Sequence, residues 1–178
     1  MIPRDALAIQ QNRVHFRLRL LSHWVDGEVA TAHRRLIDLL NSDHAEILIA
    51  EGVSVQNCLS TGCGVTTVDC AIITTSAILF AVPTEESRDA PAPRDPMTWV
   101  KKRPERALIG IGPYQISGNI YLPEGSQLRT ALVALPDRFF AVGKVVVSPA
   151  DGQGLAEEHE VVFVNRERME SIAPAPGF

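Results

Sequence analysis

Three cysteines, Cys58, Cys63 and Cys70, lie close together in the sequence, with the spacing C-x4-C-x6-C. Thiolates bind Zn²⁺ well, but a structural zinc site needs four ligands and commonly uses cysteine pairs two to four residues apart. The nearest candidate for a fourth ligand is His44. We therefore expect no metal here, and the cysteines remain weak candidates. An odd number of thiols is also no disulfide framework, which predicts a reducing, cytoplasmic location.

Other residues with chemical potential form no catalytic arrangement. The stretch Gly110-Ile-Gly112 resembles the start of a dinucleotide-binding loop, but it lacks the third glycine and continues into a predicted strand. The histidines are scattered, and no nucleophile lies in a recognisable turn. The sequence predicts neither enzymatic activity nor a cofactor.

One basic cluster comprises Lys101, Lys102, Arg103 and, a little further on, Arg106. Beside Trp99 it could contact phosphates, but we interpret it as the solvent-exposed face of a short helix. The net charge of −4 and the isoelectric point of about 5.7 argue against a general polyanion-binding protein. Aromatic residues make up 6% of the chain, which leaves few rings for base stacking.

The length and composition indicate a globular protein. The chain has 178 residues, of which 46% are hydrophobic and 21% are charged. This predicts one domain or two small ones. Because the sequence has no secretory signal and no apolar run of about 18 residues, we expect no membrane association.

The most informative pattern is an internal repeat. A shift of 91 residues aligns Gly27 with Gly118 and Pro83 with Pro174, and a shift of 92 aligns the middle of the two halves. The same shifts align several apolar pairs: Leu18 with Ile109, Val25 with Ile116, Leu36 with Leu128, Ile47 with Phe139, and Ile73 with Val164. Paired glycines and prolines in the same order indicate that a unit of about ninety residues was duplicated.

The repeat predicts the same elements twice. Apolar and polar residues alternate over 14–20, which is typical of a half-buried strand. The second strand of each half contains a glycine, Gly27 or Gly118, which indicates a sharp bend or a close backbone approach. The counterpart of the first strand covers residues 107–111. The other predicted strands cover residues 47–55, 71–74 and 78–82, with counterparts at 139–147, 161–164 and 169–173. Short helices are predicted to begin near Asp5 and Asp95, and a helical turn or tight connection is expected at 35–41 and 127–133.

A charged, proline-spaced segment separates the two halves. Such a segment cannot contribute to a core and should be semi-extended. We therefore predict a first unit over residues 1–84, a linker over 85–95 and a second unit over 96–178.

A short helix followed by five strands, with the second bent and the last two joined by a tight turn, is the plan of a small barrel. Each half resembles an Sm-like barrel, and the second half, which ends Val-Phe-Val-Asn-Arg-Glu-Arg-Met-Glu-Ser-Ile, is the closer match. The chain also resembles an uncharacterised bacterial domain family with an Arg-Leu-x-Asp-x-Leu-Asn element, here residues 35–41. The predicted fold class is all-β with short helices, in two tandem five-stranded, strongly bent Sm-like barrels.

The Sm-like resemblance implies a set of nucleotide-binding residues. In RNA-binding members, an Asp and Asn loop after the second strand and an Arg-Gly pair after the fourth line the pocket. The resemblance places Asp38 and Asn41 at the first position, and Asn165, Arg166 and Arg168 at the second. Glu167 stands where the family has glycine, and neither half carries both pieces. We expect Asp38 to cap a turn and Arg166 to lie on a solvated hairpin.

The function we expect is that of a non-enzymatic binding or assembly module. An open five-stranded barrel leaves unpaired backbone groups on its edge strands. Two fused copies can pair one edge internally and offer the other to a protein partner or to a second copy. If the geometry follows Sm-like rings, three chains would close a ring. The alternatives are binding of RNA or single-stranded DNA through the residues above, and a ligand or cofactor in a cleft between the barrels. The sequence also leaves open whether the two halves form two separate barrels or one joint sheet.

Overall fold

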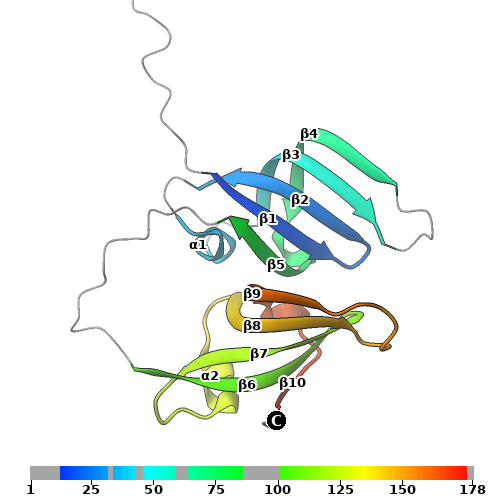
Figure 1. The fold of residues 1–178 in the computed structure, drawn as a ribbon. Helices are drawn as coiled ribbons and strands as arrows, with labels where there is room; N and C mark the ends of the chain where they lie inside the picture. The colour runs from blue at the N-terminus through cyan, green and yellow to red at the C-terminus, as the bar shows by residue number, and fades with distance from the viewer. Residues whose placement is uncertain (1–12, 32–33, 43–45, 59–63, 86–100, 176–178) are drawn as a thin grey trace, which may run out of the picture.

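The computed structural model describes residues 13–31, 34–42, 46–58, 64–85 and 101–175. This part of the chain consists mainly of β-strands, which confirms the predicted all-β class (Figure 1). We call residues 13–85 the N-terminal half and residues 101–175 the C-terminal half. The helices predicted to begin near Asp5 and Asp95 lie outside the described residues. Among the residues that are described, no helix is long and apolar enough to cross a membrane.

Both halves have the same order of elements, as the repeat predicts. The N-terminal half contains β1 (Arg13–Leu20), β2 (His23–Ala30), α1 (Leu36–Leu40), β3 (Ile47–Asn57), β4 (Val65–Thr74), the 3₁₀ turn η1 (Thr75–Ala77) and β5 (Ile78–Glu85). The C-terminal half contains β6 (Lys102–Ile111), β7 (Tyr114–Pro123), α2 (Leu128–Ala134), β8 (Phe139–Pro149), β9 (Glu157–Asn165), the 3₁₀ turn η3 (Arg166–Arg168) and β10 (Ser171–Pro174).

The ten strands form one open antiparallel sheet, in the order β10-β6-β7-β8-β9-β5-β1-β2-β3-β4. Within each half, the fifth strand therefore lies beside the first, and the fourth strand lies at the opposite end. The two halves meet where β9 pairs with β5, with Phe80 opposite Val164 and Ala81 opposite Phe163. The question of separate barrels or a joint sheet is thus answered in favour of a joint sheet. Its two outer strands are β4 and β10.

Gly27 and Gly118 lie where the strand register shifts. The pairing of β2 with β3 shifts between Asp26 and Glu28, and the pairing of β7 with β8 shifts between Ser117 and Asn119. A Cβ atom added at Gly118 would lie 2.6 Å from Cγ1 of Val142, whereas the nearest atoms to one at Gly27 would be 3.3 Å away. Neighbouring groups therefore approach both glycines closely, and more closely in the C-terminal half.

Each half has its own buried apolar cluster, and each cluster includes side chains from the other half. Phe139 and Phe163 pack into the N-terminal cluster, with residues such as Phe16 and Leu18. In the opposite direction, Leu79, Phe80 and Val82 of β5 pack into the C-terminal cluster. Burial of one such side chain stabilises the fold by roughly 1.5–3 kcal/mol. The two halves therefore share their interiors across the junction.

The fourth strand of each half is longer than the sequence indicates. The sequence predicts that the N-terminal one starts at residue 71, but β4 begins at Val65, so Cys70 lies in a strand rather than in a loop. Residues 65–70 are exposed, so they show no alternation of apolar and polar residues. Backbone pairing with β3 holds this part of β4 in place.

The basic cluster lies on a strand, contrary to our interpretation. Lys102, Arg103 and Arg106 belong to β6, which pairs with β7 along its whole length. Acidic groups lie near the cluster: Lys101 Nζ is 3.3 Å from a carboxylate oxygen of Glu124, and Arg103 pairs with Glu105. Trp99 lies outside the described residues.

Candidate functional site at the free sheet edge

The junction between β5 and β9 shows how this protein covers one of its own strand edges. Asn165 Nδ2 donates a hydrogen bond to the carbonyl of Ile78 at 2.8 Å, and Arg168 donates to the carbonyl of Ser76. Arg138 Nη1 donates to Oγ1 of Thr75 at 2.9 Å. These bonds extend the pairing of β5 and β9 toward the η1 turn, so side chains of the C-terminal half secure the start of β5.

Aromatic side chains from both halves also meet at the junction. The ring of Phe80 lies edge-on to those of Tyr114 and Trp24, with centroid distances of 5.5 Å and 5.6 Å. The guanidinium carbon of Arg19 lies 4.9 Å from the Tyr114 ring centroid and 5.3 Å from that of Trp24. Arg19 is buried, and its Nε and Nη1 have no hydrogen-bond partner among the described residues, so ring contacts help to offset its desolvation. Burial raises the pKa of Tyr114 above its ordinary value.

This cluster could not be predicted from the sequence, because its members are far apart along the chain. A strand of one half brings Phe80 to a strand of the other half, and this pairing cannot be read from periodicity. The only available signal was the aromatic type of Trp24, Phe80 and Tyr114 in a chain with few rings.

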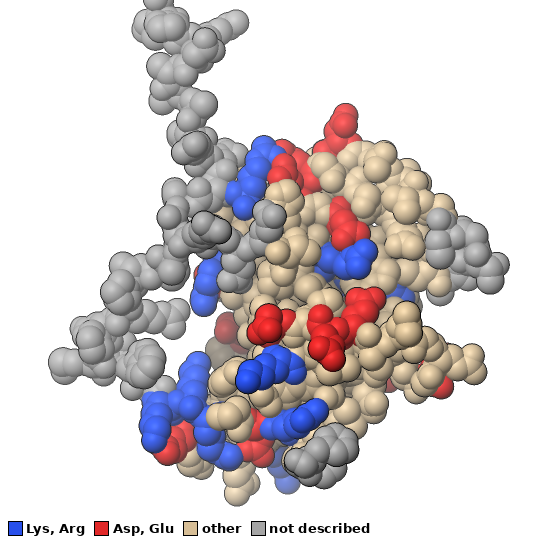
Figure 2. Space-filling view, viewed as in Figure 1, with Lys and Arg blue, Asp and Glu red and all other residues tan. Residues whose placement is uncertain are grey.

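The free edge of β4 differs from the covered edge of β9. β4 pairs with β3 on one side and is the last strand of the sheet on the other. Five apolar side chains are exposed on β3 and β4, and we call them the edge patch: Ile47, Ile49, Val65, Val68 and Ile72. Charged side chains are sparse over this end of the sheet in Figure 2. Edge strands are usually blunted by charged residues or proline, but Asp69 is the only charged residue on β4.

Two residues of the edge patch have repeat counterparts that are buried at the junction between the halves. Phe139 and Phe163 are 1% and 3% exposed, because the N-terminal half covers them. Their counterparts in the repeat, Ile47 and Ile72, are 50% and 69% exposed. Equivalent positions are therefore buried at the internal junction and uncovered at the free edge.

A hollow of about 330 Å³ lies beside the free edge, and we call it the edge hollow. It is lined mainly by apolar side chains of β1 to β4, among them Leu20, Val25, Val55, Ala71 and Ile73. In the repeat these positions correspond to Ile111, Ile116, Val147, Val162 and Val164, which share the C-terminal cluster with Phe80. The edge hollow is thus the counterpart of the region that Phe80 helps to fill in the other half.

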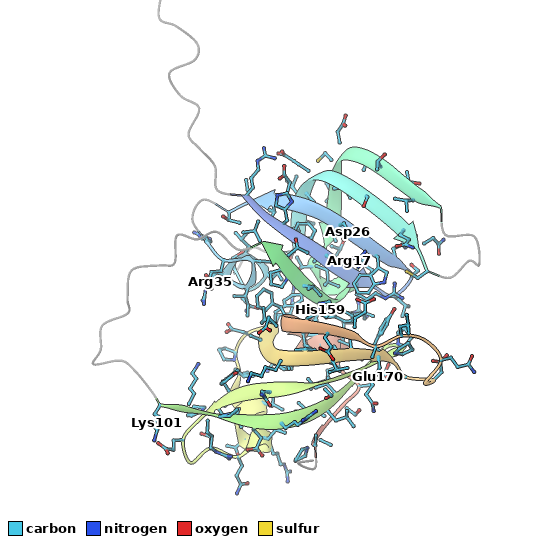
Figure 3. All side chains as sticks on the ribbon, in the orientation of Figure 1. Arg17, Asp26, Arg35, Lys101, His159 and Glu170 are labelled. Carbon is cyan, nitrogen blue, oxygen red and sulfur yellow. The ribbon has the colours of Figure 1, made fainter. Side chains whose placement is uncertain are left out.

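The outer face of β1 and β2 provides a contrast, because ion pairs cover it. Arg17 Nε lies 2.9 Å from Oδ1 of Asp26 on the neighbouring strand (Figure 3). Arg13 pairs with Glu28, and its Nη1 also lies 2.8 Å from a carboxylate oxygen of Glu51. Ion pairs of this kind are stable in contact with water, so this face needs no partner. The edge patch, which exposes apolar side chains instead, is the better candidate for a binding surface.

The residues predicted to bind nucleic acid lie mostly in structural contacts. Oδ1 of Asp38 lies 2.8 Å from Nη2 of Arg35, and Oδ2 of Asp38 accepts a hydrogen bond from the backbone N–H of Arg35. These contacts cap α1. Asn41 Nδ2 donates to the carbonyl of Phe139 at 2.8 Å, and its Oδ1 accepts from the N–H of the same residue at 2.7 Å. Asn165 is fully buried and also accepts a hydrogen bond from the N–H of Glu167. Asn41, Asn165 and Arg168 therefore connect the two halves.

Two of these residues nevertheless share one hollow. Asn41 and Arg166 line a space of about 350 Å³ together with Arg138, Glu46 and Glu167. Arg166 donates to the carbonyl of Leu135, and Arg138 Nε lies 3.2 Å from a carboxylate oxygen of Glu167. Because the amide of Asn41 is already bonded to Phe139, the two arginines are the groups here that could reach a phosphate.

The cysteines form no metal site in the described part of the chain. Cys58 and Cys70 are free thiols, and Cys70 is exposed on β4. Cys63 and His44 lie outside the described residues. Among the residues that are described, no group of three or more His, Cys, Asp and Glu side chains could hold a metal ion.

A larger hollow of about 710 Å³ lies against α2, β7 and the start of β8. Its lining includes Ile37 of α1, so both halves contribute to it. Most of its side chains are apolar, with Lys102 and Asp137 as the charged exceptions. This hollow is where the alternative of a ligand between the halves would apply.

Comparison of the chain with known protein families, curated proteins and solved structures finds no match.

Proposed function

We propose that the protein is a non-enzymatic binding and assembly module that extends its sheet through the free edge of β4. The partner strand comes from another protein or from a second copy of the chain. The observation that carries this proposal is the exposure of Ile47 and Ile72 at positions whose counterparts, Phe139 and Phe163, are buried by the other half. The same chain therefore contains one occupied and one unoccupied version of the same surface.

Physical considerations favour a partner at this surface. A long, apolar edge strand exposes unpaired backbone groups that another strand can satisfy. Ile49 and Ile72 lie opposite each other in the pairing of β3 with β4, and both are exposed. Adjoining exposed apolar residues mark an interaction site more often than isolated ones do. In the Sm-like arrangement expected from the sequence, β4 of one chain would pair with β10 of the next, and three chains would close a ring.

Solution mass across a concentration series tests the proposal. If a second copy is the partner, the mass exceeds the chain mass of 19.4 kDa and reaches three times that value for the ring. The variant Ile72→Lys should abolish this association, because it places a charge in the edge patch. A monomer at every concentration rules out the ring and leaves a separate polypeptide as the partner. An assembly that Ile72→Lys does not change contradicts the proposal.

Binding of RNA or single-stranded DNA is the second candidate function. The observation that favours it is the shared hollow of Asn41, Arg138 and Arg166. Labelled oligonucleotides, titrated at low salt, should then bind with an affinity that falls steeply as salt is added. Arg166→Ala and Arg138→Ala should each weaken binding, while Arg129→Ala, an exposed arginine on α2, serves as the control. Absence of binding at low salt eliminates this candidate.

A further inference from the structure

The internal junction acts as a template for what the free edge can accept. Phe80 of β5 lies opposite Val164 of β9, and its side chain is fully buried in the C-terminal cluster. The β5 strand thus covers the edge of β9 in two ways: its backbone pairs with β9, and its aromatic ring enters the apolar interior behind that strand.

At the free edge, the position equivalent to Val164 is Ile73, which lines the edge hollow. The hollow measures about 330 Å³. An apolar cavity of about 150 Å³ is large enough to bind benzene, so a phenyl ring fits here. An added strand would therefore need a large apolar side chain opposite Ile73.

The β10 strand of a second copy does not supply such a side chain. Phe80 pairs with Arg19, and Ser171 pairs with Gly110, the repeat counterpart of Arg19. Ser171 is therefore the repeat counterpart of Phe80. β10 is also only four residues long and includes Pro174. Pairing of β4 with β10 would bring a small hydroxymethyl group to the edge hollow and would leave most of its apolar lining unfilled.

Charge also distinguishes the two edges. Arg138, which bonds to Thr75 five residues before Phe80, has Glu46 as its repeat counterpart. Glu46 immediately precedes β3 and is exposed, although it also lines the hollow that contains Arg138 and Arg166. A partner residue five positions before the aromatic one would therefore face a carboxylate, which favours a lysine or arginine at that position.

We propose that the free edge of β4 accepts an extended segment of another polypeptide, whose aromatic side chain enters the edge hollow in the way that Phe80 enters the C-terminal cluster. The segment runs antiparallel to β4, places the aromatic residue opposite Ile73 and carries a basic residue five positions earlier. This inference rests on the proposed function, because it identifies the class of partner that the same edge would bind.

The test uses a peptide with the sequence of residues 75–85 and the change Thr75→Lys, labelled with a fluorophore and titrated into the full chain. Its affinity should fall about tenfold or more when Phe80 of the peptide is changed to serine, the residue that β10 offers. In the protein, Ala71→Phe should also weaken binding about tenfold, because the new ring occupies the edge hollow. Val133→Phe adds the same ring on exposed α2 and should leave binding unchanged.

The outcomes separate the two proposals. Equal affinity of the Phe80 and serine peptides overturns the role of the edge hollow while leaving strand addition at β4 intact. No binding of either peptide, together with a protein that is monomeric at all concentrations, contradicts both proposals. A concentration-dependent assembly of the free protein that Ile72→Lys abolishes and that excess peptide does not disturb places a second copy on the edge and overturns the assignment to another polypeptide. Circular dichroism of Ala71→Phe shows whether that variant is folded, and the peptide comparison does not depend on it.

Discussion

Lys144 adopts a backbone conformation that normally belongs to glycine. Its φ is 51°, and its repeat counterpart Gly52 has a φ of 56°. The left-handed region costs a residue with a Cβ atom roughly 1–2 kcal/mol. Because Lys144 is exposed, its side chain offers little packing that would offset this cost. The same bend is thus made with strain in the C-terminal half and without it in the N-terminal half.

We expect Lys144→Gly to raise the free energy of unfolding by about 0.5–1 kcal/mol, because it removes this strain at some cost in chain entropy. Gly52→Ala should lower it by about 1 kcal/mol, since a Cβ there meets open space and only the backbone conformation is penalised. Urea denaturation measures both. Lys144→Gln is the control, because it removes the charge and keeps the strain. A less stable Lys144→Gly protein would contradict the argument.

At the scale of the strands, the elements could be predicted better than their contacts. Strict alternation located β1, and the paired glycines mark the places where the register of β2 and of β7 shifts. The early part of β4 could not be found, because it is exposed and its order comes from pairing with β3.

A free strand edge could be expected from the sequence, but the residues that form the candidate site could not be identified from it. Ile47 and Phe139 align as two apolar residues, and only the strand order shows that one is covered and the other is not. The same limit applies to Asn41 and Asn165, for which the Sm-like resemblance implied nucleotide contacts. Their bonds to Phe139 and Ile78 depend on how the halves meet, which no local pattern records.

The two bend glycines should differ in their tolerance of a side chain. A Cβ at Gly118 would be 2.6 Å from Val142 and 3.1 Å from the carbonyl of Gly143, so the strands must move apart. We expect Gly118→Ala to lower the free energy of unfolding by about 1–3 kcal/mol, as overpacking does. Gly27→Ala, with nearest atoms at 3.3 Å, should lower it by less. Thermal or urea unfolding of both variants gives the comparison, and an equal loss would contradict the difference in packing.

At the scale of the whole molecule, the junction makes the two halves depend on each other. Each apolar cluster contains side chains from the other half, so neither interior is complete alone. Proteins in which two repeats merely follow each other can unfold one repeat at a time. Here the unfolding of the C-terminal half would expose Phe80, and the unfolding of the N-terminal half would expose Phe163. Because this exposure is unfavourable, the unfolding of one half destabilises the other.

Phe80 tests this coupling directly, because it belongs to the N-terminal half in sequence and to the C-terminal cluster in space. We expect Phe80→Ala to lower the free energy of unfolding by about 3–5 kcal/mol. Val133→Ala, at an exposed position on α2, should change it by less than about 0.5 kcal/mol. With Trp99 replaced by phenylalanine, fluorescence reports on Trp24 at the junction, while far-ultraviolet circular dichroism reports on all strands. In the Trp99→Phe protein with Phe80 intact, the two signals should change at the same denaturant concentration. Two separate transitions would mean that the halves fold independently and that the shared sheet contributes little to their stability.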